Sequence, residues 1–321
     1  MTEHKDLQTI ITNMKHTIFT PVYNRANNML GLAKHIAEIS YPKSEFEWLI
    51  IDDGSTDNLK DVVSQIVAIY PDLVIRSIHK ENGGIHTAQN CAIRNAHGEY
   101  VTRIDSDDYL LPDCLNNYDM ALASIPLKER NNVAGVVGLC MNLKDMSVRG
   151  TSFPKDSQIT KGYLLKRGGV TGDKNYCMRT DIMKEFLIPE YNDTKWVPEG
   201  GYLWLELDKK YDTLFINKPI SVCTESNPDS YTGAMNKPTL ANVMTRYYGS
   251  IYIINHGTGY YSARMILKAY MHTSLSYIYA RKFNKQAYAW SRLFNDIISF
   301  QSKCLICVCL QVAFIYLLIK R

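Results

Sequence analysis

Short apolar runs of β type alternate with segments of helical periodicity in the first part of the chain, and this alternation constrains the fold most. The expected strands are 17–20, 46–51, 73–78 and 100–104, and the expected helices are 28–39, 58–70 and 87–96. Such βαβα order predicts a parallel sheet with helices on both faces. Because crossovers between parallel strands are nearly always right-handed, the carboxyl ends of the strands should share one edge.

A polar segment follows each expected strand. The four segments are Thr20–Arg25, Asp52–Asp57, His79–Gly84 and Asp105–Asp108. Ligands of open α/β sheets bind outside the carboxyl ends of the strands, so these segments should line one crevice. No Gly-x-Gly-x-x-Gly follows the first strand, and no Gly-Lys-Ser/Thr loop occurs, which disfavours a dinucleotide site or a P-loop.

The carboxylates at these strand ends suggest a cation site. Asp105 and Asp107 stand two residues apart, and carboxylate oxygens suit Mg²⁺ or Mn²⁺ bound together with substrate phosphates. Asp52 and Asp53 could bind the same metal or accept hydrogen bonds from a nucleoside. An acidic turn exposed to solvent remains the alternative for the first pair, and turn or capping roles remain open for Ser55 and Asp57.

Together these motifs resemble the family-2 glycosyltransferases of the GT-A fold. The similarity in order and spacing covers residues 17–113 and continues more weakly to about residue 225. The resemblance implies a Rossmann-like α/β fold with a mostly parallel central sheet. It also implies an inverting, Mn²⁺- or Mg²⁺-dependent transfer of a sugar from a nucleotide-sugar donor, commonly a UDP-sugar.

The resemblance also implies roles for individual residues. Asp107 would ligate the metal, Asp105 would lie near the ribose, and one of Asp52 or Asp53 would lie near the nucleobase with Thr20 and Tyr23. Tyr23 could instead be a core aromatic residue. The residues implied in nucleotide-sugar binding are Thr20, Pro21, Tyr23, Arg25, Asp52, Asp53, Asn82, Gly83, Gly84, Asp105 and Ser106.

One position departs from the family pattern. Many similar sequences have a Lys after the Gly pair, where this chain has Ile85. A cationic contact with the diphosphate would then fall to Lys80, Arg94 or Arg103.

An inverting transfer needs a base that takes the proton of the acceptor hydroxyl. The Pro- and Gly-containing loop from Trp196 to Tyr202 is expected to supply it, with Glu199 as the base and Trp196 as an acceptor or sugar contact. A helix-start acid is the alternative reading of Glu199, and Glu206 and Asp208 are reserve candidates. Asp173 is either a further sugar contact or a turn former.

The C-terminal part differs in charge from the rest of the chain. Residues 1–238 have 26 Lys and Arg against 31 Asp and Glu, a net of −5, whereas residues 239–321 have 10 against one, a net of +9. The 16-residue run 304–319 has one polar member, Gln311. It is short for a ~30 Å hydrocarbon core, so in-plane or partial membrane insertion is expected.

The apolar run near the C-terminus is compatible with other roles. The same run is compatible with a helical hairpin on the catalytic domain or with a contact in a homo-oligomer. Nucleic acid is disfavoured as a partner, because the basic residues are spread along apolar helices and form no basic groove.

These observations predict two regions: a catalytic domain over 1–238 and a membrane-associating helical region over 239–321. Within the first, about 15–113 would bind the donor and about 133–238 would supply the acceptor contacts and the base. The expected protein is a glycosyltransferase at the cytoplasmic face of the cell membrane, peripheral or tail-anchored. It would act on a glycan or lipid-linked acceptor in surface polysaccharide synthesis. The rival functions are a catalytically degenerate nucleotide-sugar-binding protein and a nucleotide-sugar pyrophosphorylase.

Overall fold

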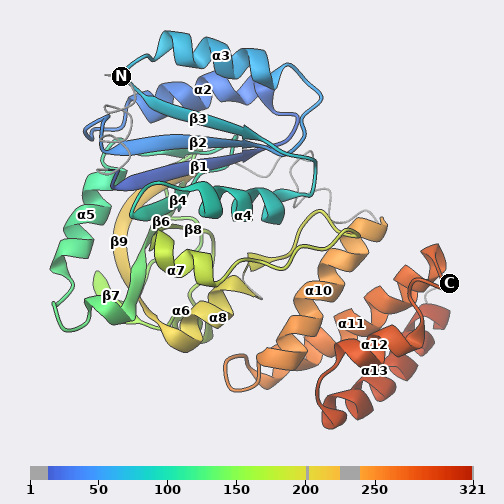
Figure 1. Cartoon of the computed structure of the whole chain (residues 1–321). Helices are drawn as coiled ribbons and strands as arrows, with labels where there is room; N and C mark the ends of the chain where they lie inside the picture. Colours follow the sequence, from blue (N-terminus) through green and yellow to red (C-terminus); the bar gives the residue numbers. More distant parts are fainter. Residues whose placement is uncertain (1–13, 200–201, 225–238, 320–321) are drawn as a thin grey trace. The chain divides into compact units, whose positions relative to one another are not determined.

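The structure is a computed structural model that describes residues 14–199, 202–224 and 239–319 (Figure 1). The chain forms two compact units. The first combines Met1–Leu187 with Leu207–Glu225, and the second combines Ile188–Glu206 with Ser226–Arg321. The predicted boundary at residue 238 lies outside the described residues.

Four parallel strands form the first part of the sheet in unit 1. They are β1 (His16–Val22), β2 (Phe46–Asp52), β3 (Val74–His79) and β4 (Tyr100–Arg103), in the order β3-β2-β1-β4. The connecting helices are α2 (Ala26–Ala37), α3 (Leu59–Ile69) and α4 (Ile85–Asn95). The α/β fold with a parallel first half, predicted from the alternation of apolar runs, is confirmed.

The strand order determines which face each helix covers. The chain steps outward from β1 to β3 and then crosses back to β4, so right-handed connections place α2 and α3 on one face and α4 on the other. Figure 1 shows this arrangement, and α4 packs against β1 and β2.

Later elements extend the sheet with mixed directions. In the order β3-β2-β1-β4-β8-β6-β9-β5, strand β8 is antiparallel to β4 and β6, whereas β6 and β9 are parallel. The remaining elements of unit 1 are β5 (Tyr109–Leu110), α5 (Cys114–Ser124), the 3₁₀ helix η1 (Arg130–Asn132), β6 (Val133–Asn142), β7 (Ser157–Thr160), α6 (Gly162–Arg167), β8 (Lys174–Arg179), α7 (Thr180–Glu185) and β9 (Asp212–Cys223). Helix α8 (Leu203–Lys210) runs from residues of unit 2 into residues of unit 1.

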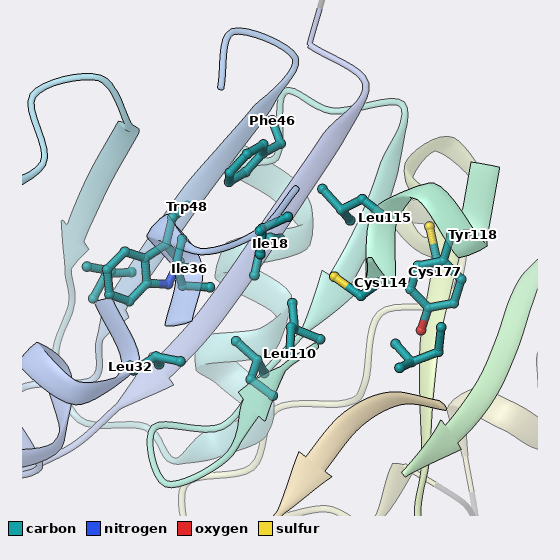
Figure 2. Packing of buried hydrophobic residues seen from close by; sticks show 14 of the residues in the cluster. Ile18, Leu32, Ile36, Phe46, Trp48, Leu110, Cys114, Leu115, Tyr118 and Cys177 are labelled. Atoms are coloured by element: carbon teal, nitrogen blue, oxygen red, sulfur yellow. The ribbon is translucent and has the colours of Figure 1, made fainter. Parts of the chain in front are cut away.

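The core of unit 1 packs strand side chains against the helices, as Figure 2 shows. Ile18, Ile36 and Trp48 are fully buried in one cluster. Burying a side chain of this size stabilises the fold by about 1.5–3 kcal/mol. Tyr118 is also fully buried, and its hydroxyl donates to Asn175 Oδ1 at 2.8 Å, which satisfies both polar groups.

Unit 2 is helical in its described part. Its helices are α10 (Leu240–His256), α11 (Ala263–Phe283), α12 (Trp290–Asp296) and α13 (Phe300–Ile319). The Thr239 hydroxyl caps α10 by accepting from Asn242 N, and the Ser262 hydroxyl caps α11 by accepting from Met265 N. Tyr247, Tyr277 and Leu293 form part of its buried cluster.

Helix α13 begins four residues earlier than the predicted apolar run. Its 20 residues correspond to a length of about 30 Å, which removes the length argument against spanning. The window Phe300–Leu317 has a mean hydropathy of 1.7, and 17% of it is buried. By length and composition it is the one helix of the described residues that could cross a membrane. Ile306 and Ala313 pack inward, whereas Val308 and Ile315 on the same helix are exposed.

Candidate functional site at the carboxyl edge of the sheet

The carboxyl ends of the first three strands are level with one another. Val22 at the end of β1 pairs with Asp52 at the end of β2, and Asp52 pairs with His79 at the end of β3. Strand β4 lies on the opposite side of β1, so the strand order reverses between β1 and β4. Such a switch point is where ligands of open α/β sheets bind. The four predicted polar segments therefore begin at one edge of the sheet.

The residues after β1 divide into buried and exposed groups. Thr20 is fully buried, and its hydroxyl accepts a hydrogen bond from Trp48 Nε1 at 3.0 Å. Tyr23 is 50% exposed, which excludes the alternative of a core aromatic residue and leaves its ring accessible at the strand end. Pro21 and Arg25 are half-buried, and Arg25 directly precedes α2.

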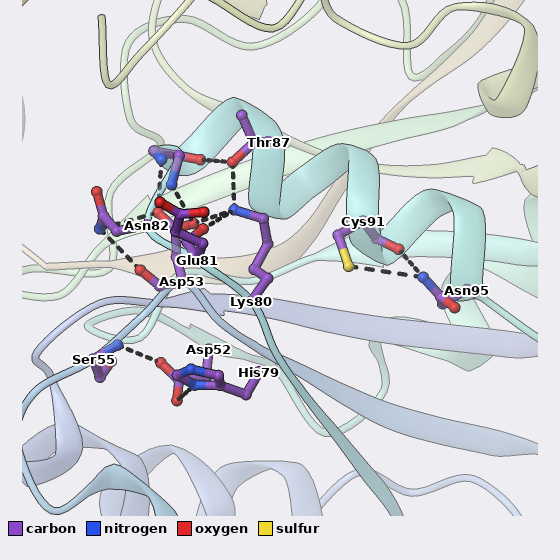
Figure 3. Close-up of polar contacts among 12 residues, drawn as sticks. Asp52, Asp53, Ser55, His79, Lys80, Glu81, Asn82, Thr87, Cys91 and Asn95 are labelled. Atoms are coloured by element: carbon purple, nitrogen blue, oxygen red, sulfur yellow. Dashed lines mark hydrogen bonds and ion pairs between the residues drawn. The ribbon is translucent and has the colours of Figure 1, made fainter. Parts of the chain in front are cut away.

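Asp53 fixes the Asn82-Gly83-Gly84 loop. Its Oδ1 accepts from Lys80 Nζ at 2.6 Å and from Gly83 N at 3.0 Å, and its Oδ2 accepts from Gly84 N at 2.8 Å (Figure 3). The Asn82 amide also donates to the Asp53 carbonyl at 2.9 Å. Only 3% of Asp53 is exposed, so its carboxylate holds the loop from a buried position.

Asp52 has a different set of partners. Ser55 N donates to its Oδ1 at 2.7 Å, and a hydrogen bond of 2.7 Å joins its Oδ2 to His79 Nδ1 (Figure 3). Burial alone would raise the pKa of Asp52, but the bonds from His79 and Ser55 outweigh burial and hold it below its ordinary value. Asp52 is therefore an ionised carboxylate at the strand end.

A second network, not predicted from the sequence, ties the first two loops together. Asn24 has a positive φ of 51°, and its Oδ1 accepts from Thr56 N at 2.7 Å. The carboxylate of Asp57 accepts from Ala26 N at 2.9 Å and from Leu59 N at 3.3 Å, the first residues of α2 and α3. One acid thus contacts the starts of two helices, which extends the expected capping role of Asp57.

Lys80 and Arg103, two of the cations proposed to replace the missing family lysine, are bound to carboxylates of unit 1. Lys80 holds Asp53 and also donates to Thr87 Oγ1 at 2.8 Å. Arg103 donates from Nε and Nη2 to the two oxygens of Asp105, at 2.7 and 3.2 Å. Such a two-point pair orients the Asp105 carboxylate.

The acidic run after β4 concentrates negative charge. Asp107 is exposed, and Ser106 between it and Asp105 is half-buried. Burial raises the pKa of Asp108 to about 6, and the carboxylates of Asp105 and Asp107 add to this rise. A divalent cation would relieve this crowding, so the donor set fits Mn²⁺ or Mg²⁺. The described residues contain no group of three or more His, Cys, Asp or Glu arranged for a metal ion.

Asp173 lies at a turn and forms an ion pair. Gly172 before it has a φ of 80°, which a residue with a side chain rarely adopts. The Asp173 carboxylate accepts from Arg149 Nε at 2.7 Å and remains 67% exposed. The geometry therefore includes both a turn and an exposed carboxylate, and both readings of Asp173 stay open.

Glu199 and Trp196 belong to unit 2, whereas the donor loops belong to unit 1. Both residues are half-buried, and the carbonyl of Glu199 accepts from Tyr202 N at 3.1 Å. The Thr194 hydroxyl bonds the backbone of Trp196, donating to its carbonyl at 2.9 Å. The two glycines between Glu199 and Tyr202 lie outside the described residues.

The two reserve candidates for the base have structural partners. Both oxygens of Asp208 accept backbone N–H groups at 2.8 Å, from Gly162 and Tyr163 at the start of α6. Burial raises the pKa of Asp208, and these two bonds oppose the rise. Glu206 accepts from the Tyr252 hydroxyl. These contacts give Asp208 a capping role at the start of α6, and Glu199 as the base stays a prediction.

Comparison with known proteins extends this picture. Residues 17–118 match the family model for glycosyl transferase family 2. A chondroitin synthase of Pasteurella multocida is 36% identical over 121 residues, which are 36% of this chain and 12% of that protein. The poly(ribitol-phosphate) β-N-acetylglucosaminyltransferase TarS of Staphylococcus aureus is 34% identical over 107 residues, which are 32% of this chain and 18% of that protein. The chain thus matches less than a fifth of the length of these curated relatives.

The solved structures support the same fold. Residues 1–349 of S. aureus TarS in complex with UDP-GlcNAc superpose with a TM-score of 0.56 and 19% identity, over 92% of this chain and 79% of that one. A second structure of the same TarS fragment gives a TM-score of 0.55 with 18% identity, over 85% and 73% of the two chains. The chain therefore contains a glycosyl transferase family 2 domain, built on a mixed, mostly parallel α/β sheet of the GT-A type.

Proposed function

We propose that this protein is an inverting, metal-dependent glycosyltransferase that moves a sugar from a UDP-sugar to a hydroxyl of a glycan or lipid-linked acceptor. The observation that carries the proposal is the joint placement of the Asp53-bound Asn82-Gly83-Gly84 loop and the Asp105–Asp108 run at one switch point of the sheet. The UDP-GlcNAc complex of the TarS fragment supports a UDP-linked donor.

Asp107, with Asp105 beside it, would hold Mn²⁺ or Mg²⁺. Once bound, the cation would neutralise charge developing on the departing diphosphate. Arg103 holds Asp105 in a fixed orientation through two hydrogen bonds, so this carboxylate needs little rearrangement when donor binds. Tyr23, half exposed at the end of β1, supplies an aromatic ring for the nucleobase.

Glu199 would act as the general base. In a single displacement the acceptor oxygen forms a bond to the anomeric carbon, and the bond to the diphosphate breaks on the opposite face. The acceptor proton passes to the Glu199 carboxylate, and the electron pair leaves with UDP. This one step inverts the anomeric configuration.

Two substitutions test these roles. Asp107→Ala should abolish Mn²⁺-dependent transfer, and addition of EDTA to the wild type should have the same effect. The assay follows release of UDP from UDP-sugars in the presence and absence of acceptor. Asp72→Ala, which removes an exposed carboxylate between α3 and β3, is the matched control and should keep wild-type activity. Transfer by Asp107→Ala at the wild-type rate would contradict the metal assignment.

Glu199→Gln should retain UDP-sugar binding and lose turnover by at least about 100-fold, because general-base catalysis contributes on the order of 10²–10⁴. Binding is measured by thermal stabilisation with a panel of nucleotide-sugars and Mn²⁺. Full transfer activity in this variant would remove Glu199 from the mechanism.

The same experiments separate the rival functions. A degenerate binding protein would be stabilised by UDP-sugar but would release no UDP from it. A pyrophosphorylase would need a Gly-rich, Arg-containing loop after β1, where this chain has Pro21-Val22-Tyr23-Asn24-Arg25. The sequence of that loop favours transfer.

We further propose that unit 2 attaches the enzyme to the cytoplasmic face of the cell membrane, beside a lipid-linked acceptor used in surface polysaccharide synthesis. Helix α13 supports this location, because Val308, Val312 and Ile315 are about half exposed on an apolar helix, at 55, 49 and 57%. The net charge of +9 over residues 239–321 would favour an anionic surface.

A further inference from the structure

Unit 2 contains a cavity of ≈ 400 Å³, and all of its lining residues belong to that unit. The walls come from residues 189–198, from Tyr202, from α10 and from α12. Its size lies within the range of about 300–1,000 Å³ that is typical of sites for small molecules. The loops at the carboxyl edge of the sheet belong to unit 1 and contribute none of these lining residues.

Tyrosine rings dominate the cavity wall. Tyr191 and Tyr248 are stacked with centroids 3.6 Å apart and planes 3° apart, and the Tyr202 and Tyr252 rings are 4.3 Å apart. Tyr252 also stacks on His256 at 4.4 Å. Four tyrosines and one imidazole thus line one small volume, although one face of Tyr191 and one face of Tyr248 are covered by each other.

Hydrogen bonds hold some of these rings in place. The Tyr248 hydroxyl donates to Asp193 Oδ1 at 2.7 Å and accepts from Arg292 Nη2 at 2.8 Å. The Tyr252 hydroxyl donates to Glu206. Rings that are already oriented lose little conformational freedom when a ligand binds, so such a wall is preorganised.

The charged groups of the cavity are balanced. Arg292 and Asp296 both line it, and Arg292 also contacts Asp193 at 3.3 Å. A phosphate or nucleotide would need an excess of positive charge, which this balance does not provide. Guanidinium, carboxylate and the amide of Asn255 can instead bind hydroxyl groups as donors and acceptors.

Aromatic faces beside groups that bind hydroxyls match one class of ligand. A sugar ring presents an apolar face of C–H bonds and an edge of hydroxyl groups, so it can lie on a tyrosine ring while its hydroxyls reach the polar side chains. An acyl chain has no groups that could bind the side chains of Arg292, Asp296 and Asn255, whereas the hydroxyls of a sugar can bind them.

The cavity also adjoins the proposed base in the sequence. Val197 and Pro198 line it immediately before Glu199, and Tyr202 lines it after the two glycines. We propose that this cavity binds a neutral sugar ring of the acceptor saccharide, with its tyrosines as the stacking surface and its polar groups as hydroxyl ligands. The proposal rests on the proposed function, because only a glycosyltransferase would use Glu199 to deprotonate that acceptor.

The test is saturation-transfer NMR on the full-length protein with lactose, maltose and N,N′-diacetylchitobiose as probes. Saturation transfer from the protein to the ring protons of at least one saccharide probe is expected. Tyr191→Leu and Tyr202→Leu should weaken that binding about tenfold, because each removes a ring face and keeps an apolar side chain. Tyr202→Phe keeps the ring and should bind as the wild type does. Tyr316→Leu, which removes a 47% exposed tyrosine on α13, is the matched control.

Three results would overturn the proposal. They are the absence of saturation transfer to every probe, undiminished saturation transfer in both leucine variants, and displacement of the bound probe by pyrophosphate. Transfer to the alkyl chain but not the sugar of decyl maltoside would assign the cavity to a lipid and overturn it as well. Release of UDP from UDP-GlcNAc with Mn²⁺ is measured on the same preparation. Saccharide binding without any donor turnover would contradict the proposed function alone, and donor turnover without saccharide binding would contradict the cavity assignment alone.

Discussion

At the scale of single residues, two neighbouring carboxylates at the end of β2 do different work. Asp53 points its oxygens at Lys80 and at two backbone N–H groups of the Gly83-Gly84 turn. Asp52 is bound by Ser55 and His79. Asp52 is the last residue of β2 and Asp53 the first residue after it, so the adjacent acids lie in different local backbone settings and meet different neighbours. Asp53 therefore holds the loop that follows β3, and Asp52 holds the turn that follows β2.

Asp53→Asn should therefore destabilise the protein by about 2–4 kcal/mol, because the new amide places an N–H donor against Lys80 or a glycine N–H. UDP-sugar affinity should fall with it, since the glycine loop loses its anchor. Urea unfolding and donor titration measure the two effects. The exposed Asp72→Asn should stay within about 0.5 kcal/mol of the wild type. Equal stability of both variants would show that the loop does not depend on this carboxylate.

At the scale of elements, the site depends on how closely loops approach one another. Gly54 has a φ of 78°, and a Cβ built on it would lie 2.8 Å from Asn82 N. A side chain at Gly54 would therefore meet both an unfavourable φ and a clash with the backbone of Asn82. Gly31 within α2 has nothing within 4 Å of such a Cβ. Gly54 is therefore required by the backbone geometry, whereas Gly31 could be replaced by alanine without a clash, so the two positions serve as test and control.

Gly54→Ala should destabilise the fold by about 1–3 kcal/mol and weaken donor binding, because the loop must move. Gly31→Ala should stabilise it by about 0.5–1 kcal/mol, since alanine is the better helix former. Thermal unfolding and donor titration report both. The reverse order of stability would contradict the placement of Gly54 against Asn82.

Asp119 on α5 joins that helix to the start of β1. Its carboxylate accepts from Lys15 Nζ at 2.7 Å and from the Tyr41 hydroxyl at 2.6 Å, and it is 3.0 Å from His16 Nε2. Burial would raise the pKa of Asp119, but these three bonds outweigh it and hold the pKa well below its ordinary value. The folded state therefore binds this proton less readily than the unfolded chain does.

A carboxylate whose pKa is lowered by folding stabilises the folded state when the pH is above the pKa of the unfolded chain, about 3.9. This contribution disappears as the pH falls towards the pKa of the folded state. Asp119→Asn should cost about 2 kcal/mol at pH 7. The difference from the wild type should shrink below about pH 4. Urea unfolding at a series of pH values measures it, and a difference that does not change with pH would contradict the ionic role.

At the scale of the whole molecule, charge and apolar surface are segregated along the chain. Residues 239–321 carry a net charge of +9 and include α13, whose exposed residues are mostly apolar. The rest of the chain, at −5, includes the carboxylates proposed to hold the cation. Under the proposed function the two charges would serve different partners, a diphosphate bound through a metal and an anionic membrane surface.

The full-length protein should bind vesicles that contain phosphatidylglycerol, and binding should weaken as salt screens the basic residues. Val308→Glu and Ile315→Glu should each reduce binding at least about tenfold, because a charge must enter the apolar layer. Met120→Glu, at a 64% exposed site on α5, is the control. Sedimentation with vesicles measures binding. Wild-type binding to vesicles by both α13 variants would contradict the membrane role. If the variants instead convert a dimer of the protein to a monomer, α13 would be assigned to the interface between two copies of the chain.

The sequence predicted the order of elements well for particular reasons. Apolar residues form short, nearly continuous runs in β1 and β2 and recur with helical spacing in α2 and α3, and these patterns depend only on local geometry. The expected strand 46–51 and the observed Phe46–Asp52 differ by one residue. The start of α13 was predicted four residues late, because residues 300–303 include polar side chains that interrupt the apolar run but that a helix tolerates.

By itself, the sequence determined the βαβα order, the polar segments at the strand ends and the segregation of charge, because these follow from local periodicity and composition. Only the tertiary structure decided which polar groups meet. It paired Lys80 with Asp53 and Thr224 N with Asp108, at separations of 27 and 116 residues. It also grouped 188–206 with the C-terminal helices and enclosed the tyrosine-lined cavity. Contacts over such separations depend on how the chain folds back on itself, which residue spacing does not encode.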